Sequence, residues 1–217
     1  MPSTLRALIF DLDGVITDTV ELHFKSWVRL AEEVGLTTPL DFRDRLRGVS
    51  RRETLRRLLD GQAIEETQAQ EWMRLKNMYY LAHIAYLTPA DLLPGVLALL
   101  DDAQADGLKL AVASSSMNAK FVLKQLGLFE RMDAIADATM IPRTKPEPDL
   151  FIWAAGRLGV LPDEAIVFED AEDGVRAALN AGFQVVGLGP ANVGAAHLVL
   201  PGLDAIRLAE LRARLGW

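Results

Sequence analysis

Two aspartates follow the first apolar run of the chain, and their type and spacing suit phosphoryl transfer. Residues 5–10 are mostly apolar, and Asp11 and Asp13 follow directly, ahead of Gly14. In a strand both carboxylates would share one face, but a chain that leaves the strand at Asp11 can place them around one reacting atom. Gly14 permits the tight turn. Asp11 is therefore a candidate nucleophile and Asp13 a candidate general acid and base, although an ordinary polar turn has the same pattern.

Polar side chains also follow two later apolar runs. The run at 108–113 leads into three serines and the run at 165–168 into two acidic residues, namely Ser114, Ser115, Ser116, Glu169 and Asp170. In an open α/β sheet, ligands bind outside the carboxyl ends of the parallel strands. We therefore expect these residues to converge with the two aspartates at one edge of a sheet.

The serine segment is a candidate phosphate site. Residues 114–118 lie between a predicted strand and a predicted helix, so their hydroxyls and free backbone N–H groups could surround a phosphate. The candidate contacts are Ser114, Ser115, Ser116 and Asn118. An ordinary helix cap would account for the same residues.

A lysine between two prolines and a cluster of acids could complete such a site. Lys145 lies in a loop that Pro146 and Pro148 restrict, and its ammonium could bind phosphoryl oxygens. Glu169 and Asp170 could hold a divalent cation together with Asp11. The chain has no cysteine, so hard oxygen ligands are expected, and Mg²⁺ suits them best.

Composition narrows the class of protein. A net charge of −7 argues against nucleic acid as the main partner, although a local basic cluster could bind a small phosphorylated molecule. That cluster comprises Arg43, Arg45, Arg47, Arg51 and Arg52. The first residues lack the layout of a signal peptide, so a cytoplasmic location is expected. Residues 177–203 carry no charged side chain, yet their glycines and prolines favour a buried strand with loops over a membrane span.

The order of the predicted elements indicates a split domain. A helix is expected from about residue 20 to Gly35, and residues up to about 90 are mostly helical and highly charged. From 92 onward, predicted helices alternate with strands at 108–113, 133–136, 165–168 and 184–188, which is typical of a parallel sheet. We therefore predict a doubly wound, Rossmann-like α/β core made of residues 1–16 and 91–217, with an inserted helical cap domain at 17–90.

Taken together, these motifs resemble those of the haloacid dehalogenase superfamily. The four motifs are matched by Asp11-Leu12-Asp13-Gly14, Ser114, Lys145 and Glu169-Asp170. Residues 10–19, followed by His23 and Trp27, are similar to the β-phosphoglucomutase family in particular. The resemblance implies interconversion of β-D-glucose 1-phosphate and glucose 6-phosphate through an aspartyl-phosphate and β-glucose 1,6-bisphosphate. It also implies Mg²⁺ held by Asp11, Glu169, Asp170 and the backbone carbonyl of Asp13.

The predicted cap carries a second part of the resemblance. The segment Arg47-Gly48-Val49-Ser50-Arg51 is similar to the family's substrate loop, which implies that Gly48, Val49 and Arg51 bind substrate and that Arg51 holds the phosphate that is not transferred. Hinge or supporting roles are implied for Thr19, His23 and Lys76. The chain departs from the family at Met117 and Arg47, where lysine is common. Without the resemblance, a basic loop at a helix start would explain the segment equally well.

Two other functions stay open at this point. A cap-bearing sugar-phosphate phosphatase would use the same two aspartates but let water attack the aspartyl-phosphate, and a non-catalytic binding protein would not need the complete catalytic set. The expected partners are small sugar phosphates, with no nucleic acid and no membrane, and a monomer is expected.

Overall fold

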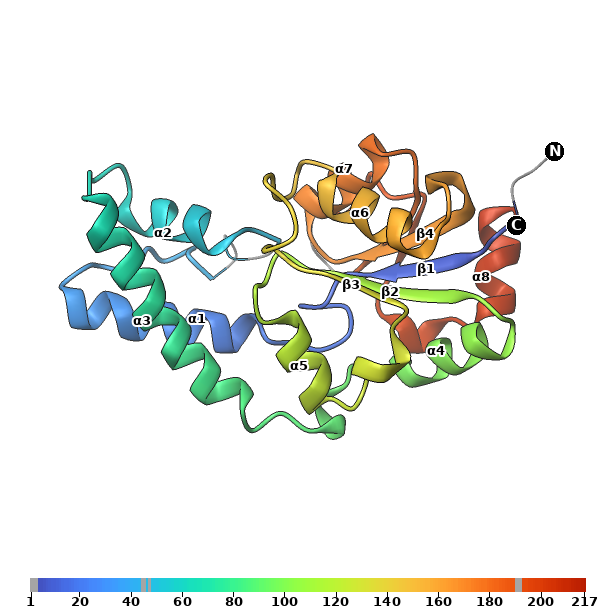
Figure 1. Cartoon of the computed structure of the whole chain (residues 1–217), viewed down its shortest axis with the longest axis horizontal. Coiled ribbons are helices and arrows are strands. Elements are labelled where there is room, and N and C mark those ends of the chain that lie inside the picture. Colours follow the sequence, from blue (N-terminus) through green and yellow to red (C-terminus); the bar gives the residue numbers. More distant parts are fainter. Residues whose placement is uncertain (1–3, 44–45, 47, 190–192) are drawn as a thin grey trace.

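The computed structural model describes residues 4–43, 46, 48–189 and 193–217. Its centre is a six-stranded sheet in the order β3-β2-β1-β4-β5-β6, with every neighbouring pair parallel (Figure 1). The strands are β1 (Ala7–Phe10), β2 (Lys109–Ala113), β3 (Ala134–Ala136), β4 (Ala165–Glu169), β5 (Gln184–Leu188) and β6 (Leu198–Leu200). The predicted doubly wound α/β core is confirmed.

Helices cover both faces of this sheet. Alternate residues of a strand point to opposite faces, so Leu8 and Phe10 of β1 join one hydrophobic core while Ala7 and Ile9 join another. The first core also includes α4 (Val96–Ala105), α5 (Ala119–Gln125) and α8 (Leu208–Leu215), and the second includes α6 (Asp149–Leu158) and α7 (Glu172–Asn180). Burial on both faces explains why the strands read as continuous apolar runs.

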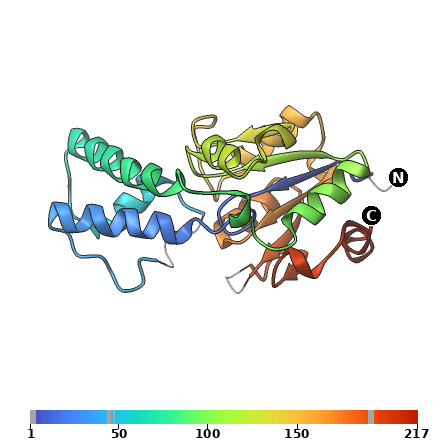
Figure 2. The same cartoon turned by 90° about the horizontal axis from the view of Figure 1, so that it is seen from below.

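Three helices form a separate lobe next to the carboxyl edge of the sheet (Figures 1 and 2). They are α1 (Val20–Val34), α2 (Arg51–Leu59) and α3 (Glu66–Ile84), which pack around a third core that includes Trp27, Leu30, Phe42 and Leu58. Helix α1 ends at Gly35, whose φ of 74° is the left-handed conformation that glycine adopts easily. The side chain of Ser50 caps α2 by accepting a hydrogen bond from the backbone N–H of Glu53.

The chain crosses between the lobes twice, and the two crossings are hydrogen-bonded to each other. The N–H of Leu93 donates to the carbonyl of Ile16 at 2.9 Å, and Thr17 Oγ1 donates to the carbonyl of Asp91 at 2.8 Å. A hinge at this pair of crossings would let the helical lobe move as a unit. The division into a core of residues 1–16 and 91–217 and a cap of residues 17–90 stays a prediction.

Two elements differ from expectation. Strand β6 was not predicted, because it is only three residues long within a segment rich in glycine. Helix α4 begins at Val96 rather than near Leu92, because a 3-10 turn and Pro94-Gly95 precede it. The 3-10 turns are η2 (Pro89–Asp91), η3 (Phe129–Arg131), η4 (Pro162–Glu164) and η5 (Leu203–Ala205). No helix in the described part of the chain is both long and apolar enough to span a bilayer.

Candidate active site

The carboxyl edge of the sheet gathers the predicted polar strand ends. Strand β1 lies between β2 and β4, with Phe10 in register with Val112 and Phe168. The backbone N–H of Asp11 still bonds to the carbonyl of Phe168 at 2.9 Å, so the aspartate begins where the strand stops. From β1 the sheet grows in one direction through β2 and β3, and from β4 it grows in the other direction through β5 and β6. Open α/β sheets bind ligands at such a boundary, which here lies between β1 and β4.

Lys145 lies at the centre of this edge, fully buried. Its Nζ donates to Asp11 Oδ1 at 2.5 Å, to the carbonyl of Ala113 at 3.2 Å and to Glu169 Oε1. Burial opposes the charge of Lys145, but the carboxylates of Asp11 and Glu169 outweigh it and raise the pKa of the ammonium above its ordinary value. The lysine is therefore a fixed cation directly beside the candidate nucleophile.

Asp13 differs from Asp11 in having no partner for its buried oxygen. Asp13 Oδ1 forms no hydrogen bond within the described residues, and the same is true of Thr19 Oγ1 and Tyr80 Oη. Burial, reinforced by the charge of Asp11, raises the pKa of Asp13 to about 7. A carboxyl group with such a pKa can both donate and accept a proton near neutrality, as a general acid and base must.

The acidic pair at the end of β4, Glu169 and Asp170, is buried but is not arranged around an open metal site. Glu169 Oε1 accepts from Lys145, and Oε2 accepts from the backbone N–H of Ala171 at 3.0 Å. Burial raises the pKa of Glu169 above its ordinary value. Within the described ranges, no three Asp, Glu or His side chains are grouped closely enough to enclose a metal ion. Asp11, Glu169 and Asp170 nevertheless place three carboxylates at one edge beside one ammonium, which fits a hard divalent cation by donor type and charge.

Gly174, in the first turn of α7, leaves space for the Glu169 carboxylate. A Cβ at this position would lie 1.9 Å from Glu169 Oε1. We expect Gly174→Ala to push Glu169 away from Lys145, to destabilise the fold by about 1–3 kcal/mol and to lower turnover. At Gly156, also helical, the ideal Cβ would meet no atom within 4 Å beyond its own stretch of helix, so Gly156→Ala is the matched control and should not destabilise. The denaturant midpoint and the turnover rate of each variant are the measurements. Equal midpoints and equal rates for the two variants would contradict the expectation.

The hydroxyls after β2 cap their own loop. Ser114 Oγ accepts from the backbone N–H of Ser116 at 3.0 Å, and Ser116 Oγ accepts from that of Asn118 at 3.2 Å. These bonds lie within the loop, and the helix cap that the sequence left open as an alternative is not seen, because Asn118, the N-cap of α5, makes no side-chain capping hydrogen bond. The hydroxyl protons of these serines are not used by those two bonds and remain available to an anion.

The helical lobe contributes two basic side chains that contact each other, the buried Lys76 and the partly buried His23. Lys76 Nζ lies 2.6 Å from His23 Nδ1, and the lysine also lies over the rings of Tyr80 and Trp27, at 4.6 and 5.4 Å from their centroids. The His23 ring stacks on Tyr80 at 3.8 Å. Burial lowers the pKa of both His23 and Lys76 well below their ordinary values. Thr19 is fully buried beside the start of α1.

Lys76 is expected to reduce stability, because no carboxylate in the described residues forms a salt bridge with it. Its pKa is lower in the folded chain than in the unfolded chain, so the unfolded state binds more protons and stability falls as the pH drops below 10.5. We expect Lys76→Met to raise the free energy of unfolding at neutral pH by about 2 kcal/mol and to weaken this pH dependence. The exposed Lys25→Met is the control, and urea unfolding at several pH values is the measurement. A less stable Lys76→Met would contradict the expectation.

The predicted substrate loop reaches across to the sheet. Ser115 Oγ donates to the carbonyl of Gly48 at 3.1 Å, and a Cβ at Gly48 would lie 2.9 Å from Ala171 Cβ. Gly48 has a φ of 70°, so glycine serves here both for its conformation and for the close approach. Val49 and Arg51 line the cavity beside it. The helical lobe therefore touches the loops that carry the serines and the acidic pair.

Among the described arginines of the basic cluster, Arg51 alone has no salt bridge. Arg52 pairs with Glu66, and Arg43 pairs with Glu21 at 3.1 Å. Arg51 makes no salt bridge within the described residues. Burial lowers its pKa from the ordinary value. Arg45 and Arg47, the other predicted members of the cluster, lie outside the described residues.

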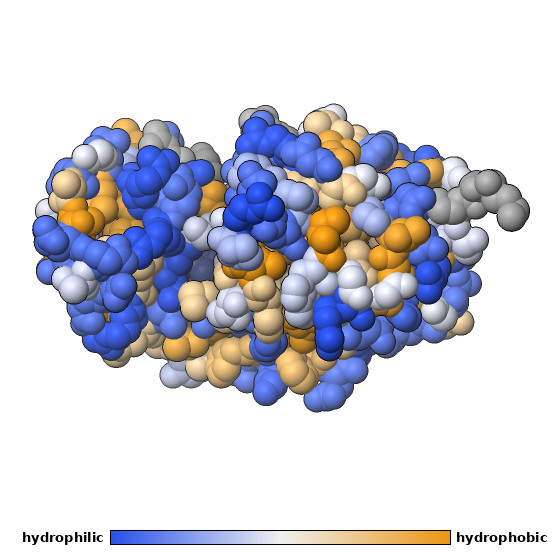
Figure 3. Space-filling model, turned by 45° about the horizontal axis from the view of Figure 1, so that its top comes forward, coloured by the Kyte–Doolittle hydropathy of each residue, from blue (hydrophilic) through white to orange (hydrophobic). Residues whose placement is uncertain are grey.

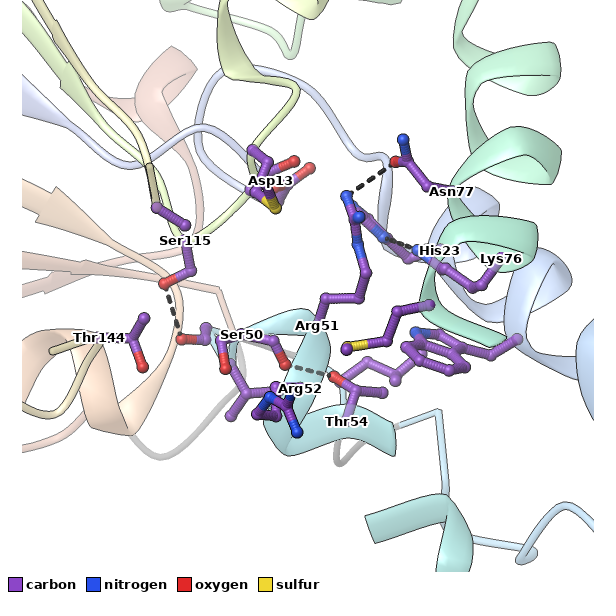
Figure 4. Close-up of a pocket in the computed structure, with 18 of the residues that line it drawn as sticks. Asp13, His23, Ser50, Arg51, Arg52, Thr54, Lys76, Asn77, Ser115 and Thr144 are labelled. Carbon is purple, nitrogen blue, oxygen red and sulfur yellow. Dashed lines mark hydrogen bonds between the residues drawn. The ribbon is translucent and has the colours of Figure 1, made fainter. Parts of the chain in front are cut away.

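A cavity of about 500 Å³ lies between the sheet edge and the helical lobe and is lined by residues of both. The space-filling view shows a notch between the two lobes (Figure 3), and the close-up shows Asp13 and Ser115 on one side of the pocket with Arg51, Lys76 and Asn77 on the other (Figure 4). The volume lies within the usual range for small-molecule sites. Met117, which takes the place of a common lysine, also lines the pocket and is half-exposed.

Sequence reasoning missed Asn77 and Tyr80. Both lie on α3: Asn77 lines the pocket beside Arg51, and Tyr80 is buried against the ring of His23, which lines the pocket. Lys76 and Tyr80 are one helical turn apart, so a signal existed once Lys76 was considered. Nothing in the sequence links Asn77 to Arg51, 26 residues away.

Comparisons with known proteins cover both lobes. A sequence model of haloacid dehalogenase-like hydrolases matches residues 8–188. The β-phosphoglucomutase of Bacillus subtilis is 43% identical over 85% of this chain and 84% of that protein. A phosphorylated carbohydrates phosphatase of Thermotoga maritima is 31% identical over 83% of each chain. The crystal structure of a β-phosphoglucomutase from Clostridium difficile matches with a TM-score of 0.94, at 35% identity, over 98% of both chains.

Proposed function

Because the chain belongs to the haloacid dehalogenase-like hydrolase family, we propose that it acts as a β-phosphoglucomutase. In this reaction the enzyme converts β-D-glucose 1-phosphate into glucose 6-phosphate through β-glucose 1,6-bisphosphate. The proposal draws on the relatives with that name and on the geometry of the pocket.

The observation that carries the proposal is the position of Arg51. Asp11 and Lys145 provide phosphoryl-transfer chemistry at the sheet edge, while Arg51, with no salt bridge in the described residues, faces the same cavity from the helical lobe. A guanidinium fork is well suited to a phosphate. A site with two phosphate-binding ends matches a sugar bisphosphate, which a simple monophosphate hydrolase does not need.

The chain's own residues account for the proton and phosphoryl steps. Phosphorylated Asp11 gives its phosphoryl group to the 6-hydroxyl of β-glucose 1-phosphate, while Asp13 takes the hydroxyl proton. The bisphosphate turns around, and the Asp11 carboxylate attacks phosphorus at the 1-position. Asp13 then returns its proton to the departing C1 oxygen, which releases glucose 6-phosphate and regenerates phosphorylated Asp11.

Fixed charges support these transfers. Lys145 and Ser114 bind the oxygens of the moving phosphoryl group, whose displacement depends mainly on positioning and charge stabilisation. Asp11, Glu169, Asp170 and the backbone carbonyl of Asp13 would hold Mg²⁺, which would supply further positive charge. Because Glu169 contacts Lys145 and Ala171 through its two oxygens, we assign it the further task of holding the lysine in place.

Closure of the helical lobe favours the sugar hydroxyl over water as acceptor. A closed pocket excludes solvent and completes the site only around a fitting substrate. Thr19 directly precedes α1, His23 lies in the first turns of α1, and Lys76 of α3 contacts His23, so we assign these residues supporting roles in that closure. We include in the proposal that the enzyme is cytoplasmic and monomeric.

The test uses the purified protein with Mg²⁺, β-glucose 1-phosphate and a trace of glucose 1,6-bisphosphate. Glucose 6-phosphate and inorganic phosphate are followed together. The proposal expects glucose 6-phosphate without stoichiometric inorganic phosphate. Inorganic phosphate with free glucose would instead assign the chain to the sugar-phosphate phosphatases, the second candidate, which a 31% identical relative supports.

A further inference from the structure

One side-chain oxygen joins both lobes inside the pocket. Asn77 Oδ1, on α3, accepts from Arg51 Nη2 at 2.8 Å and from Asn118 Nδ2 at 2.9 Å. Arg51 is the first residue of α2, and Asn118 precedes α5 on the sheet side. Figure 4 shows Asn77 and Arg51 turned toward each other at the rim of the pocket. A single amide thus sets the separation of two donors from different lobes.

Asn77 is a neutral acceptor, so its hydrogen bond does not compensate the positive charge of Arg51. Arg52, the next residue, forms a salt bridge with Glu66 at the surface. Arg51 is hydrogen-bonded only to an amide oxygen within the described residues, so its orientation is fixed while its charge stays uncompensated. A carboxylate at position 77 would hold the guanidinium equally well but would compete with an anionic ligand.

Both donors keep capacity for a ligand. A guanidinium has five N–H groups and an amide nitrogen has two, so one bond each to Asn77 leaves four on Arg51 and one on Asn118. A phosphate between these groups would receive charge-assisted bonds from the helical lobe and a neutral bond from the sheet side.

We propose that Asn77 is a positioning residue that aligns Arg51 and Asn118 for the phosphate that is not transferred, and that its neutral side chain keeps the charge of Arg51 available. This inference rests on the proposed function, because only a bisphosphate-handling site needs that second phosphate position. It assigns a role to a residue of α3 outside the substrate loop.

The test compares Asn77→Ala and Asn77→Asp for binding of glucose 1,6-bisphosphate, in an Asp11→Asn background that prevents turnover. The Kd should rise about 10-fold for Asn77→Ala, because two aligned donors lose their acceptor. It should rise about another 10-fold for Asn77→Asp, because a carboxylate then pairs with Arg51. Gln68→Asp, an exposed substitution on the same helix, adds the same charge away from the pocket and should leave the Kd unchanged.

Two results would overturn the inference. Equal Kd values for Asn77→Ala and Asn77→Asp would show that neutrality is irrelevant, and tighter binding by Asn77→Ala would show that the amide occupies the place of the phosphate. With Asp11 intact, the effect should fall on KM for β-glucose 1-phosphate and change kcat by less than about 3-fold. Because Kd is measured without turnover, a wild-type chain that proves to be a phosphatase would refute the mutase without altering this comparison.

Discussion

Replacing Asp13 with Asn is expected to lower kcat for mutase turnover by about 10²–10⁴-fold, which is the usual contribution of a positioned general acid and base. Asn has nearly the same shape but cannot exchange a proton. Burial and the charge of Asp11 raise the pKa of Asp13 to about 7, so the native carboxyl can perform both halves of the proton transfer. The measurement is the steady-state rate of glucose 6-phosphate formation.

The control for this substitution lies five residues further along. Asp18 is exposed, and its Oδ1 accepts from the backbone N–H of Val20, a bond that an amide oxygen can also accept. Asp18→Asn should therefore retain full activity. An Asp13→Asn variant that keeps more than about a tenth of the native rate would assign the proton transfers to another group.

The strand ends of the core could be predicted because local pattern determines them. Apolar runs buried on both faces stop at residues that cannot be buried without partners, so the positions of Asp11, Ser114 and Glu169 follow from the sequence. The order of the strands does not follow from the same pattern. Strand β6 has only three residues, too few for a periodic pattern to identify a strand, so its identity depends on pairing with β5.

In the helical lobe, the local sequence pattern does not determine which charged side chains form salt bridges. The basic cluster near Arg51 was visible as composition, but the sequence could not tell which arginine keeps its charge. Pairing of Arg52 with Glu66 depends on how α2 meets α3, and the contact of Arg51 with Asn77 depends on the same packing. Charge availability is thus a tertiary property.

Metal ligation is the part of the prediction that geometry leaves most open. Donor type alone assigns Glu169 as a ligand, because it is acidic and ends a strand. In the fold, its two oxygens contact Lys145 and the backbone of Ala171, a contact that the close approach of Gly174 permits. A carboxylate at a strand end can therefore bind a lysine side chain instead of, or in addition to, a metal ion. The sequence does not indicate that Glu169 contacts Lys145.

Lys145→Met is expected to cost both stability and activity. It removes the ammonium that compensates Asp11 and Glu169, leaving two buried carboxylates without a cation, so the free energy of unfolding should fall by about 3–5 kcal/mol. Turnover should fall by at least about 10²-fold, because the transferring phosphoryl group loses its fixed charge. Denaturant unfolding in the absence of Mg²⁺ and the mutase assay measure the two effects.

The pH dependence of this deficit separates lost charge compensation from lost packing. Burial raises the pKa of Glu169 and Lys145 opposes that rise, so without Lys145 the folded state binds more protons than the unfolded state and stability falls as pH rises. The deficit of Lys145→Met should therefore be larger at about pH 8 than at about pH 5. Lys76→Met is the matched comparison, because the same substitution at a buried lysine without a salt bridge in the described residues should stabilise the chain. A deficit of equal size at both pH values, or the same sign of effect at both lysines, would mean that packing of the methylene chain, and not charge, dominates at Lys145.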